Sequence, residues 1–347
     1  MKIAVYGAGS LGTIIGAYLT KEYGKNSVDL IAHGKQHIQD LNDKGAHVTG
    51  SVDFSVPVSA KTPEELKNQD YDIVLLLTKQ THNNEVLKKI KKILKPDGTL
   101  VSLQNGVPEV KIIKQINPKN VVAGSVEFGG TLLNNVESEL TTELPLFNKL
   151  AFQIGELDGK TTPRIKKIKE VLSNVGGTEI SDNLLGTKWS KLLINASFSG
   201  LSAASNATFG QIADDKVGIE SALNIINEGL KAGKADGVVF AKMSSLDLNS
   251  FAINSQNDEK KQLVFLNKIM QNSKNLKASM LQDLEKGRQT EINDINGIIA
   301  ETGKKHDIPT PFNDLVIEIV TKSQNTGKLP EFNDTMQKFS ALLTKEN

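Results

Sequence analysis

Lys191 and Asn195 are two polar residues that stand four apart. Asn195 lies within the otherwise apolar stretch 192–196, and Lys191 directly precedes that stretch. A spacing of four places both side chains on one face of a helix. A lysine that is removed from water has a lowered pKa and can donate a proton near neutral pH. The pair therefore suggests a general acid beside a hydrogen-bonding amide. The alternatives are a lysine on the helix surface and a core amide whose hydrogen bonds are satisfied.

A second polar segment begins at Ser279 and contains two carboxylates three apart, Glu291 and Asp294. Like charges at this spacing on a helix repel slightly. Two carboxylates would hold a metal only with further ligands such as histidine, and the surrounding sequence has none. The chain also has no cysteine, which excludes disulfides, thiolate catalysis and cysteine–metal sites. We therefore expect no metal site.

A glycine-rich turn lies between a predicted strand, Lys2–Tyr6, and a predicted helix, with the pattern G-x-G-x-x-G over residues 7–12. In this pattern the first glycine allows a sharp turn, the second lets a pyrophosphate approach, and the third lets the helix pack closely on the strand. The pyrophosphate would lie at the N-terminus of the helix. The alternative is a tight turn with a structural role only. We expect the cofactor to be bound by Gly7, Gly9, Ser10, Leu11 and Gly12.

Two later apolar segments also end in polar residues, with Lys79 after the run 71–77 and Asn105 after 100–103. Ligands of open α/β sheets bind at the carboxyl ends of the strands. A lysine considered alone is more often a surface residue. The place of Lys79 at the end of a buried strand, beside the glycine turn, favours contact with the cofactor or the substrate. We therefore expect Lys79 and Asn105 to contact cofactor and substrate.

The end of the second predicted strand, 27–32, bears on the choice of cofactor. An acidic residue there binds the ribose of NAD, whereas a basic cluster suits the 2′-phosphate of NADP. His33 and Lys35 follow this strand, and Asp29 lies earlier, within it. We expect His33 and Lys35 to bind the cofactor and to favour NADPH. The absence of an arginine at this place leaves NADH open.

The elements that must position these residues fall into two groups. Strand and helix signals alternate up to residue 183, and the continuous apolar run 71–77 is typical of a parallel strand buried on both faces. We predict an α/β fold, with an N-terminal Rossmann-type doubly wound sheet over 1–183 that binds a dinucleotide and an all-helical substrate-binding domain over 184–347. The residues after Leu329 form a last helix or fray. Helices are predicted over 184–196, 217–235, 262–287, 290–305 and from 309 onward.

Composition places the chain among ordinary globular proteins, with 347 residues, a formal net charge of +1 and 38% hydrophobic residues. A charge so close to zero gives no reason to expect binding to nucleic acid or to an acidic membrane surface. No apolar run approaches the ~20 residues of a membrane span. The N-terminal apolar stretch is short and forms the first strand, so we expect no signal peptide and a cytoplasmic protein.

Together these motifs resemble the ketopantoate reductase (2-dehydropantoate 2-reductase) family from residue 1 to residue 311. The resemblance implies reduction of a 2-oxo acid to a D-2-hydroxy acid with NADPH, most specifically of ketopantoate to pantoate in pantothenate biosynthesis. It implies that Lys191 is the general acid and that Glu291 binds substrate and orients this lysine. Some members of the family are dimers, which suggests a homodimer. The resemblance implies that the substrate is contacted by Lys79, Asn105, Asn195, Ser279 and Glu291.

The chain departs from the family pattern at three places. Ser199-Gly200 replaces the usual asparagine–proline pair, Phe209 lies where a polar substrate contact is usual, and His33 replaces an arginine. We count Ser199 among the substrate-binding residues. Two other functions therefore stay open beside ketopantoate reduction. One is a D-2-hydroxyacid dehydrogenase for branched or aromatic 2-oxo acids, with NADPH or NADH, and the other is a non-catalytic NADP-binding sensor on the same fold.

Overall fold

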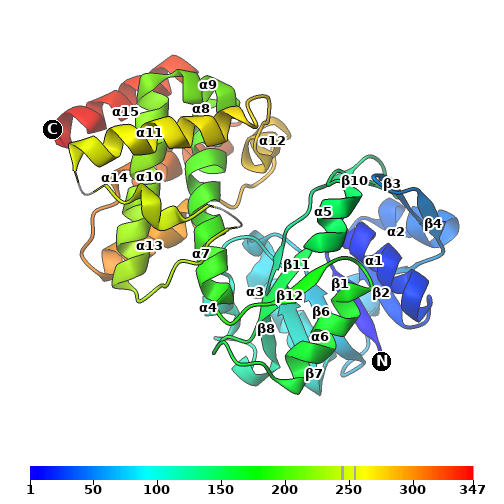
Figure 1. Ribbon diagram of the computed structural model, residues 1–347. Coiled ribbons are helices and arrows are strands. Elements are labelled where there is room, and N and C mark those ends of the chain that lie inside the picture. The colour runs from blue at the N-terminus through cyan, green and yellow to red at the C-terminus, as the bar shows by residue number, and fades with distance from the viewer. Residues whose placement is uncertain (244–245, 254, 347) are drawn as a thin grey trace. The chain divides into compact units, whose positions relative to one another are not determined.

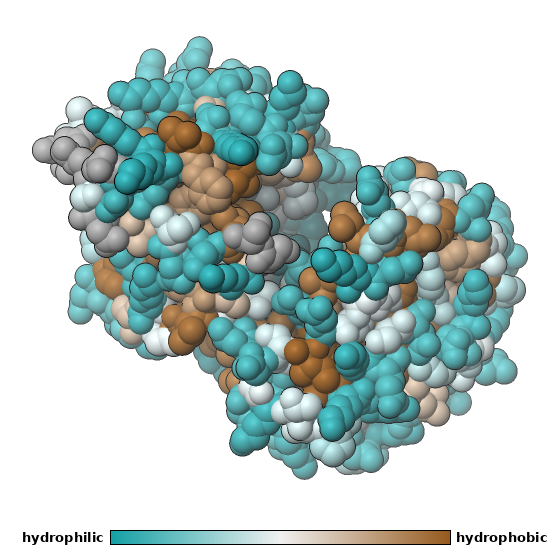
Figure 2. Space-filling view, in the orientation of Figure 1, coloured by the Kyte–Doolittle hydropathy of each residue, from teal (hydrophilic) through white to brown (hydrophobic). Residues whose placement is uncertain are grey.

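The computed structural model describes residues 1–243, 246–253 and 255–346. It forms two compact units, one over Met1–Leu184 and one that begins at Leu185 (Figure 1). The first unit is α/β and the second is helical, which confirms the predicted fold class. On the face drawn in Figure 2, hydrophilic side chains cover most of each unit. In the part of the chain that the structure describes, no helix is long and apolar enough to cross a membrane.

An eight-stranded sheet forms the centre of the first unit. Six neighbouring strands are parallel and follow the order 3-2-1-4-5-6 of the doubly wound fold. The two strands beyond β8 run in the opposite direction. In spatial order the strands are β12 (Thr178–Ile180), β11 (Phe152–Gly155), β8 (Val121–Val126), β7 (Leu94–Ser102), β6 (Tyr71–Leu76), β1 (Ile3–Tyr6), β2 (Val28–Ile31) and β5 (Ser59–Lys61).

Apolar side chains cover both faces of this sheet, as the run 71–77 predicts. On one face Val5 and Leu75 pack with Ile14 of α1, and on the other Val74 packs with Ile90 of α3. Burying a branched side chain stabilises the fold by about 1.5–3 kcal/mol, so these two layers hold the strand ends in place. The helices of this unit are α1 (Ser10–Tyr23), α2 (Lys35–Lys44), α3 (Asn83–Ile93), α4 (Glu109–Ile112), α5 (Leu144–Lys149) and α6 (Pro163–Ser173), with 3-10 turns at η1 (Pro63–Glu65), η2 (Gln80–His82) and η3 (Pro118–Asn120).

A second, four-stranded sheet packs on α1. The sequence predicts β structure between residues 46 and 59 but not the partner strands, which come about 80 residues later in the chain. Gly130 allows the close approach, because a Cβ there would stand 2.8 Å from a side-chain atom of Ile14. In spatial order the strands are β4 (Phe54–Val56), β3 (Ala46–Gly50), β10 (Glu137–Leu140) and β9 (Gly130–Leu132).

The second unit is built around α10 (Lys216–Ala235), which contacts most of the other helices (Figure 1). Its buried residues include Leu223, Ile226 and Leu230, so apolar side chains face neighbours along its length. The other elements are α7 (Leu184–Ile194), the π-helical turn η4 (Asn195–Gly200), α8 (Leu201–Ser205), α9 (Phe209–Asp214), η5 (Leu248–Phe251), α11 (Gln256–Gln271), α12 (Ser279–Glu285), η6 (Ile292–Asp294), α13 (Asn296–Lys305), α14 (Pro311–Thr326) and α15 (Phe332–Glu346).

The helices predicted over 262–287 and 290–305 are wrong in their bounds. The helix predicted over 262–287 is two helices, because the carbonyls of Lys274 and Leu276 in the linking segment accept hydrogen bonds from Gly210 and Phe209 of α9. The helix predicted over 290–305 begins at Asn296, since Ile295 has φ −112° and ψ −85° and lies outside the helical region. Residues 292–294 form a separate 3-10 turn instead.

The chain after Leu329 forms a helix rather than fraying. In α15, Phe339 is fully buried and its ring stacks on that of Phe312, with centroids 6.1 Å apart. The hydroxyl of Thr335 donates to the carbonyl of Ala204 at 2.8 Å, which fixes the helix against α8.

Candidate active site

The glycine turn has a different steric reason for each glycine. Gly7 has φ +115°, and a Cβ there would stand 2.7 Å from the backbone nitrogen of Thr78 at the end of β6. A Cβ at Gly12 would collide with the carbonyl of Gly7, so this residue allows α1 to start against the turn. Gly9 instead faces open space, with no atom within 4 Å of its Cβ position. Space at the second glycine is what the approach of a pyrophosphate requires.

The N-terminus of α1 is suited to an anion. Within the described residues, its first turn, which begins with Ser10 and Leu11, contains no acidic side chain and no side chain caps it. The turn itself is fixed from behind, because Gly7 and Ala8 both donate to the carbonyl of Ile31 at the end of β2. The side chain of His37, in the first turns of α2, contacts the carbonyl of Ala8 with its Nε2 at 2.8 Å. His37 therefore links α2 to the glycine turn.

The end of β2 contains no carboxylate that could bind a ribose. Asp29 is 2% exposed and accepts hydrogen bonds from Ser59 at 2.7 Å, Lys61 at 2.9 Å and Tyr71 at 2.7 Å. Burial alone would raise the pKa of Asp29, but these hydrogen bonds outweigh it and keep the pKa below its usual value. His33 and Lys35 lie beyond the strand end and are both exposed.

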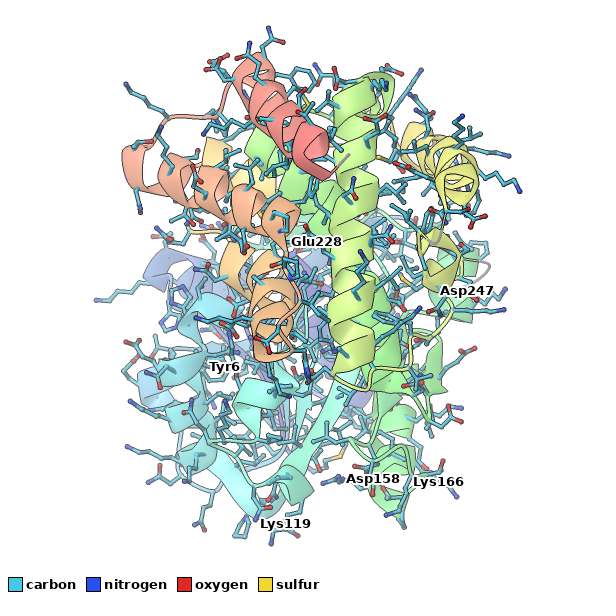
Figure 3. The ribbon with its side chains drawn as sticks, turned by 90° about the vertical axis from the view of Figure 1, so that its left-hand side faces the viewer. Tyr6, Lys119, Asp158, Lys166, Glu228 and Asp247 are labelled. Carbon is cyan, nitrogen blue, oxygen red and sulfur yellow. The ribbon has the colours of Figure 1, made fainter. Side chains whose placement is uncertain are left out.

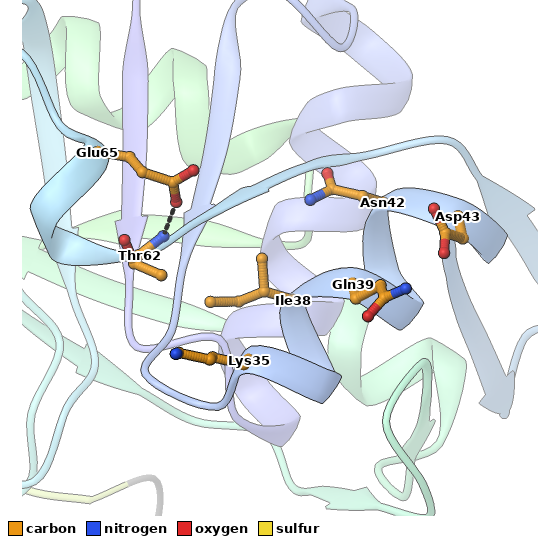
Figure 4. A pocket seen from close by; sticks show the side chains of 7 residues that line it. All are labelled: Lys35, Ile38, Gln39, Asn42, Asp43, Thr62 and Glu65. Carbon is orange, nitrogen blue, oxygen red and sulfur yellow. Dashed lines mark hydrogen bonds between the residues drawn. The ribbon is translucent and has the colours of Figure 1, made fainter.

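A shallow hollow of about 380 Å³ lies between α2 and the turn after β5 (Figure 4). One wall is the capping box of η1, in which the backbone nitrogen of Thr62 donates to Glu65 at 2.6 Å. This volume is at the lower end for small-molecule pockets. Among its lining residues only Lys35 belongs to the predicted site. The hollow is lined by Lys35, Ile38, Gln39, Asn42, Asp43, Thr62 and Glu65.

Buried amides tie together the two loops that carry Lys79 and Asn105. Gln104 donates through Nε2 to the carbonyl of Thr78 at 2.6 Å and to Oδ1 of Asn83 at 2.7 Å. Gln80 donates to the carbonyl of Asn105 at 2.7 Å. Since β6 and β7 are neighbours in the sheet, this network sets Lys79 and Asn105 in fixed places near the glycine turn.

In the second unit, Lys191 lies near the end of α7 and Asn195 begins the π-turn η4. Both side chains are half-buried, as is Ser199 in the same turn. The predicted end of this helix at Ala196 is wrong, because the chain continues from α7 through η4 into α8. π-turns inside helices are frequent at functional sites.

Ser279 and Glu291 occupy separate elements of the second unit. Ser279 is the exposed first residue of α12, and α12 packs against η4. Glu291 lies directly before η6, where Thr290 donates through its backbone nitrogen to Gln324 at 2.7 Å. Glu291 precedes the 3-10 turn η6 and Asp294 is its last residue, so they do not share an α-helical face as predicted. η6 leads into α13, whose first residue, Asn296, donates to the carbonyl of Ala196 in η4.

Several residues that hold these groups in place are missed by sequence reasoning. His37 lies two residues after Lys35 and Gln104 directly before Asn105. An amide that follows an apolar strand is a signal that could have identified Gln104. Asn83 carries no such signal, because its partner is 21 residues away in the chain.

Comparison with known proteins decides the family. The model of the ketopantoate reductase PanE/ApbA family matches residues 3–152, and the model of its C-terminal part matches residues 183–324. The chain belongs to the ketopantoate reductase family. This confirms the resemblance, and the protein is an oxidoreductase of that family.

Relatives of this ketopantoate reductase family member are similar over nearly their whole length. The 2-dehydropantoate 2-reductase of Pyrococcus horikoshii is 26% identical over 94% of this chain and 99% of its own. That of Lactococcus lactis subsp. lactis is 25% identical over 94% and 99%. Among solved structures, a ketopantoate reductase from Ralstonia eutropha JMP134 has a TM-score of 0.79 and 23% identity, covering 94% of this chain and 99% of its own. A D-mandelate dehydrogenase solved with NADH and anilino(oxo)acetate has a TM-score of 0.78 and 22% identity, with the same coverage.

Proposed function

We propose that this protein reduces a 2-oxo acid to a D-2-hydroxy acid with NADPH, with ketopantoate as substrate and pantoate as product. The observation that carries the proposal is that a chain matching the family in both halves also has Lys191, Asn195, Ser279 and Glu291 in the family's order. Relatives that bear the name 2-dehydropantoate 2-reductase support this substrate.

The residues of the first unit fit a nicotinamide dinucleotide. Open space at Gly9 and the uncapped N-terminus of α1 suit the pyrophosphate. His33 and Lys35 would bind the 2′-phosphate of NADPH, while Asp29 is occupied by its own partners. NADH remains an alternative, because histidine is a weaker phosphate ligand than arginine. When bound, the nicotinamide supplies the hydride that reduces the carbonyl carbon.

The chain's own residues would then complete the reaction. As the carbon is reduced, the electron pair of the carbonyl bond moves to the oxygen, and the ammonium of Lys191 stabilises this charge and donates a proton to it. A proton from water restores Lys191. Glu291 would orient the lysine and bind substrate, and Asn105, Asn195, Ser199 and Ser279 would position the 2-oxo acid, with Lys79 between cofactor and substrate.

A second candidate is a D-2-hydroxyacid dehydrogenase for branched or aromatic 2-oxo acids. The ring of Phe209 packs edge-on against that of Phe198 in η4, with centroids 5.4 Å apart. This pair places aromatic side chains next to Ser199. The family pattern has an asparagine at the position of Ser199 and a polar substrate contact at the position of Phe209. The likeness in fold to D-mandelate dehydrogenase agrees with this alternative.

A substrate panel tests both candidates. Purified enzyme is assayed with ketopantoate, 2-oxoisocaproate and phenylglyoxylate, each with NADPH and with NADH. We expect kcat/KM for ketopantoate with NADPH to exceed the others by about tenfold or more, a difference within reach of a few pocket contacts. Preference for an apolar 2-oxo acid would favour the second candidate and make Ser199 and Phe209 the specificity residues. No turnover with any pair would favour the NADP-binding sensor.

A further inference from the structure

The π-turn η4 changes which residues share a face with Lys191. In a continuous α-helix, Ser199, eight residues after Lys191, would lie roughly 80° away from it around the axis. A π-turn closes i→i+5 hydrogen bonds and so rotates less per residue than an α-helix. Over Asn195–Gly200 this brings Ser199 back toward the face of Lys191 and Asn195. The shape of the turn therefore decides which polar groups meet a substrate.

A chain of fully buried amides leads from this turn into the core of the second unit. Asn296 donates through Nδ2 to the carbonyl of Ala196 at 3.3 Å and to Oδ1 of Asn313 at 3.0 Å. Asn313 donates in turn through Nδ2 to Glu228 at 2.7 Å and to the carbonyl of Ile225 at 3.3 Å. Asn296 and Asn313 are both 0% exposed.

Glu228 sets the direction of this chain of hydrogen bonds. It projects from α10 toward the N-terminus of α14, where its carboxylate also accepts from the backbone nitrogens of Phe312 at 2.8 Å and Asn313 at 2.9 Å (Figure 3). Both oxygens of Glu228 accept these backbone bonds, and the same carboxyl group accepts from the NH₂ group of Asn313. The oxygen of Asn313 then faces Asn296, whose own NH₂ group is left to reach Ala196.

Gly200, at the end of the turn, is shaped to the same amide. A Cβ at this position would stand 2.5 Å from Oδ1 of Asn296. Asn296 has little freedom to move away, because both of its NH₂ hydrogens are engaged and its side chain is buried. The lack of a side chain at Gly200 therefore leaves the room that the Asn296 amide occupies beside the turn.

We propose that Asn296 and Asn313, oriented by Glu228, are positioning residues that hold η4 in its π-helical shape. They thereby set where Asn195 and Ser199 present their polar groups relative to Lys191. None of the three is assigned to contact substrate or cofactor. The catalytic part of this inference rests on the proposed function, whereas the part that concerns the shape of the turn does not.

The test is Asn296→Ala, with Asn227→Ala as a matched control. Asn227 is also a buried amide of this unit, but among the described residues its hydrogen-bond partners are the carbonyls of Leu223 and Phe251 and the backbone nitrogen of Ile253, all of them outside the turn. Hydrogen exchange over residues 195–205 is measured without ligand, and kinetics follow with the 2-oxo acid that the wild type prefers. In Asn296→Ala we expect exchange to rise about tenfold and kcat/KM for the 2-oxo acid to fall ten- to a hundredfold or so, with KM for NADPH unchanged.

Asn227→Ala should lower the Tm to a similar extent and leave both the exchange over 195–205 and the kinetics unchanged. Unaltered exchange in Asn296→Ala would overturn the proposal, and so would altered exchange without a kinetic effect. An equal kinetic loss in Asn227→Ala would show that the effect is general destabilisation. If the wild type reduces no 2-oxo acid, the proposed function fails, whereas the exchange result still decides whether the amides hold the turn.

A double-mutant cycle probes the contact with Gly200 directly. Gly200→Ala alone should lower kcat/KM, because the added Cβ displaces Asn296. In the Asn296→Ala background the obstructing oxygen is absent, so the same change should cost little more. Residues in contact give such non-additive effects. Fully additive losses would contradict the assigned role of the Gly200–Asn296 contact.

Discussion

Lys191 is the residue on which the proposed chemistry depends most directly. Reduction of a carbonyl leaves negative charge on oxygen, and only a group with an acidic proton can both stabilise and neutralise it. Asn195, four residues along the chain, offers an amide that can donate a hydrogen bond but cannot give up its proton at neutral pH. The lysine and the amide therefore have separate tasks, and substitution of the lysine should affect turnover more than binding.

We expect Lys191→Ala to bind NADPH with a dissociation constant close to that of the wild type while kcat falls on the order of 10²–10⁴-fold, the usual range for loss of an acid–base group. Fluorescence titration with NADPH and steady-state kinetics measure the two quantities. Lys231→Ala, which removes an exposed lysine from α10, should change neither. Unchanged turnover in Lys191→Ala would remove the lysine from the mechanism.

At the scale of elements, local patterns could be predicted from the sequence and distant partners could not. The glycine turn is recognisable because its steric needs are met by residues within one turn of chain, and Gly9 and Gly12 have the expected surroundings. The π-turn was missed because the amide that bonds to it, Asn296, lies 100 residues from Ala196 in the chain, so the sequence around the turn does not show the contact. The sheet containing β3 and β10 was missed for the same reason, since its strands come from distant segments.

The link between α2 and the glycine turn gives a prediction at this scale. His37→Ala removes the contact between Nε2 and the carbonyl of Ala8, and a hydrogen bond of this kind contributes about 0.5–1.5 kcal/mol. We expect the dissociation constants of NADPH and NADH to rise equally, by about two- to tenfold, because the turn would bind the pyrophosphate common to both. His33→Ala should weaken NADPH alone, since its proposed partner is the 2′-phosphate. Isothermal titration with both cofactors tells the two effects apart, and a cofactor-selective loss in His37→Ala would contradict this role.

At the scale of the whole molecule, the central sheet separates the residues proposed to bind the cofactor from a group of ion pairs at the opposite ends of the strands. The residues proposed to bind the cofactor lie at the carboxyl ends of the strands. Charged groups concentrate toward the opposite ends, where Lys2 pairs with Asp70 at 3.0 Å and Lys95 with Asp72 at 2.8 Å. Asp29 is the buried member of this charged region, with Lys2 3.7 Å away. Its partners come from β5, from β6 and from Lys2 directly before β1, so one carboxylate joins strands across the sheet.

The buried carboxylate makes stability depend on pH in a defined direction. Because the folded-state pKa of Asp29 is lowered, the unfolded chain binds more protons between the two pKa values, and stability is lost as the pH falls below the ordinary carboxyl value of about 3.9. Asp29→Asn should lower the Tm at pH 7 by about 5–10 °C, since it leaves Lys61 without its buried partner. It should also flatten the decline of Tm between pH 5 and 3, read by circular dichroism, an interval of roughly one unit on either side of the ordinary value. Asp97→Asn, which removes an exposed carboxyl in the first half of β7, should follow the wild type. An Asp29→Asn profile parallel to it would exclude Asp29 as the titrating group.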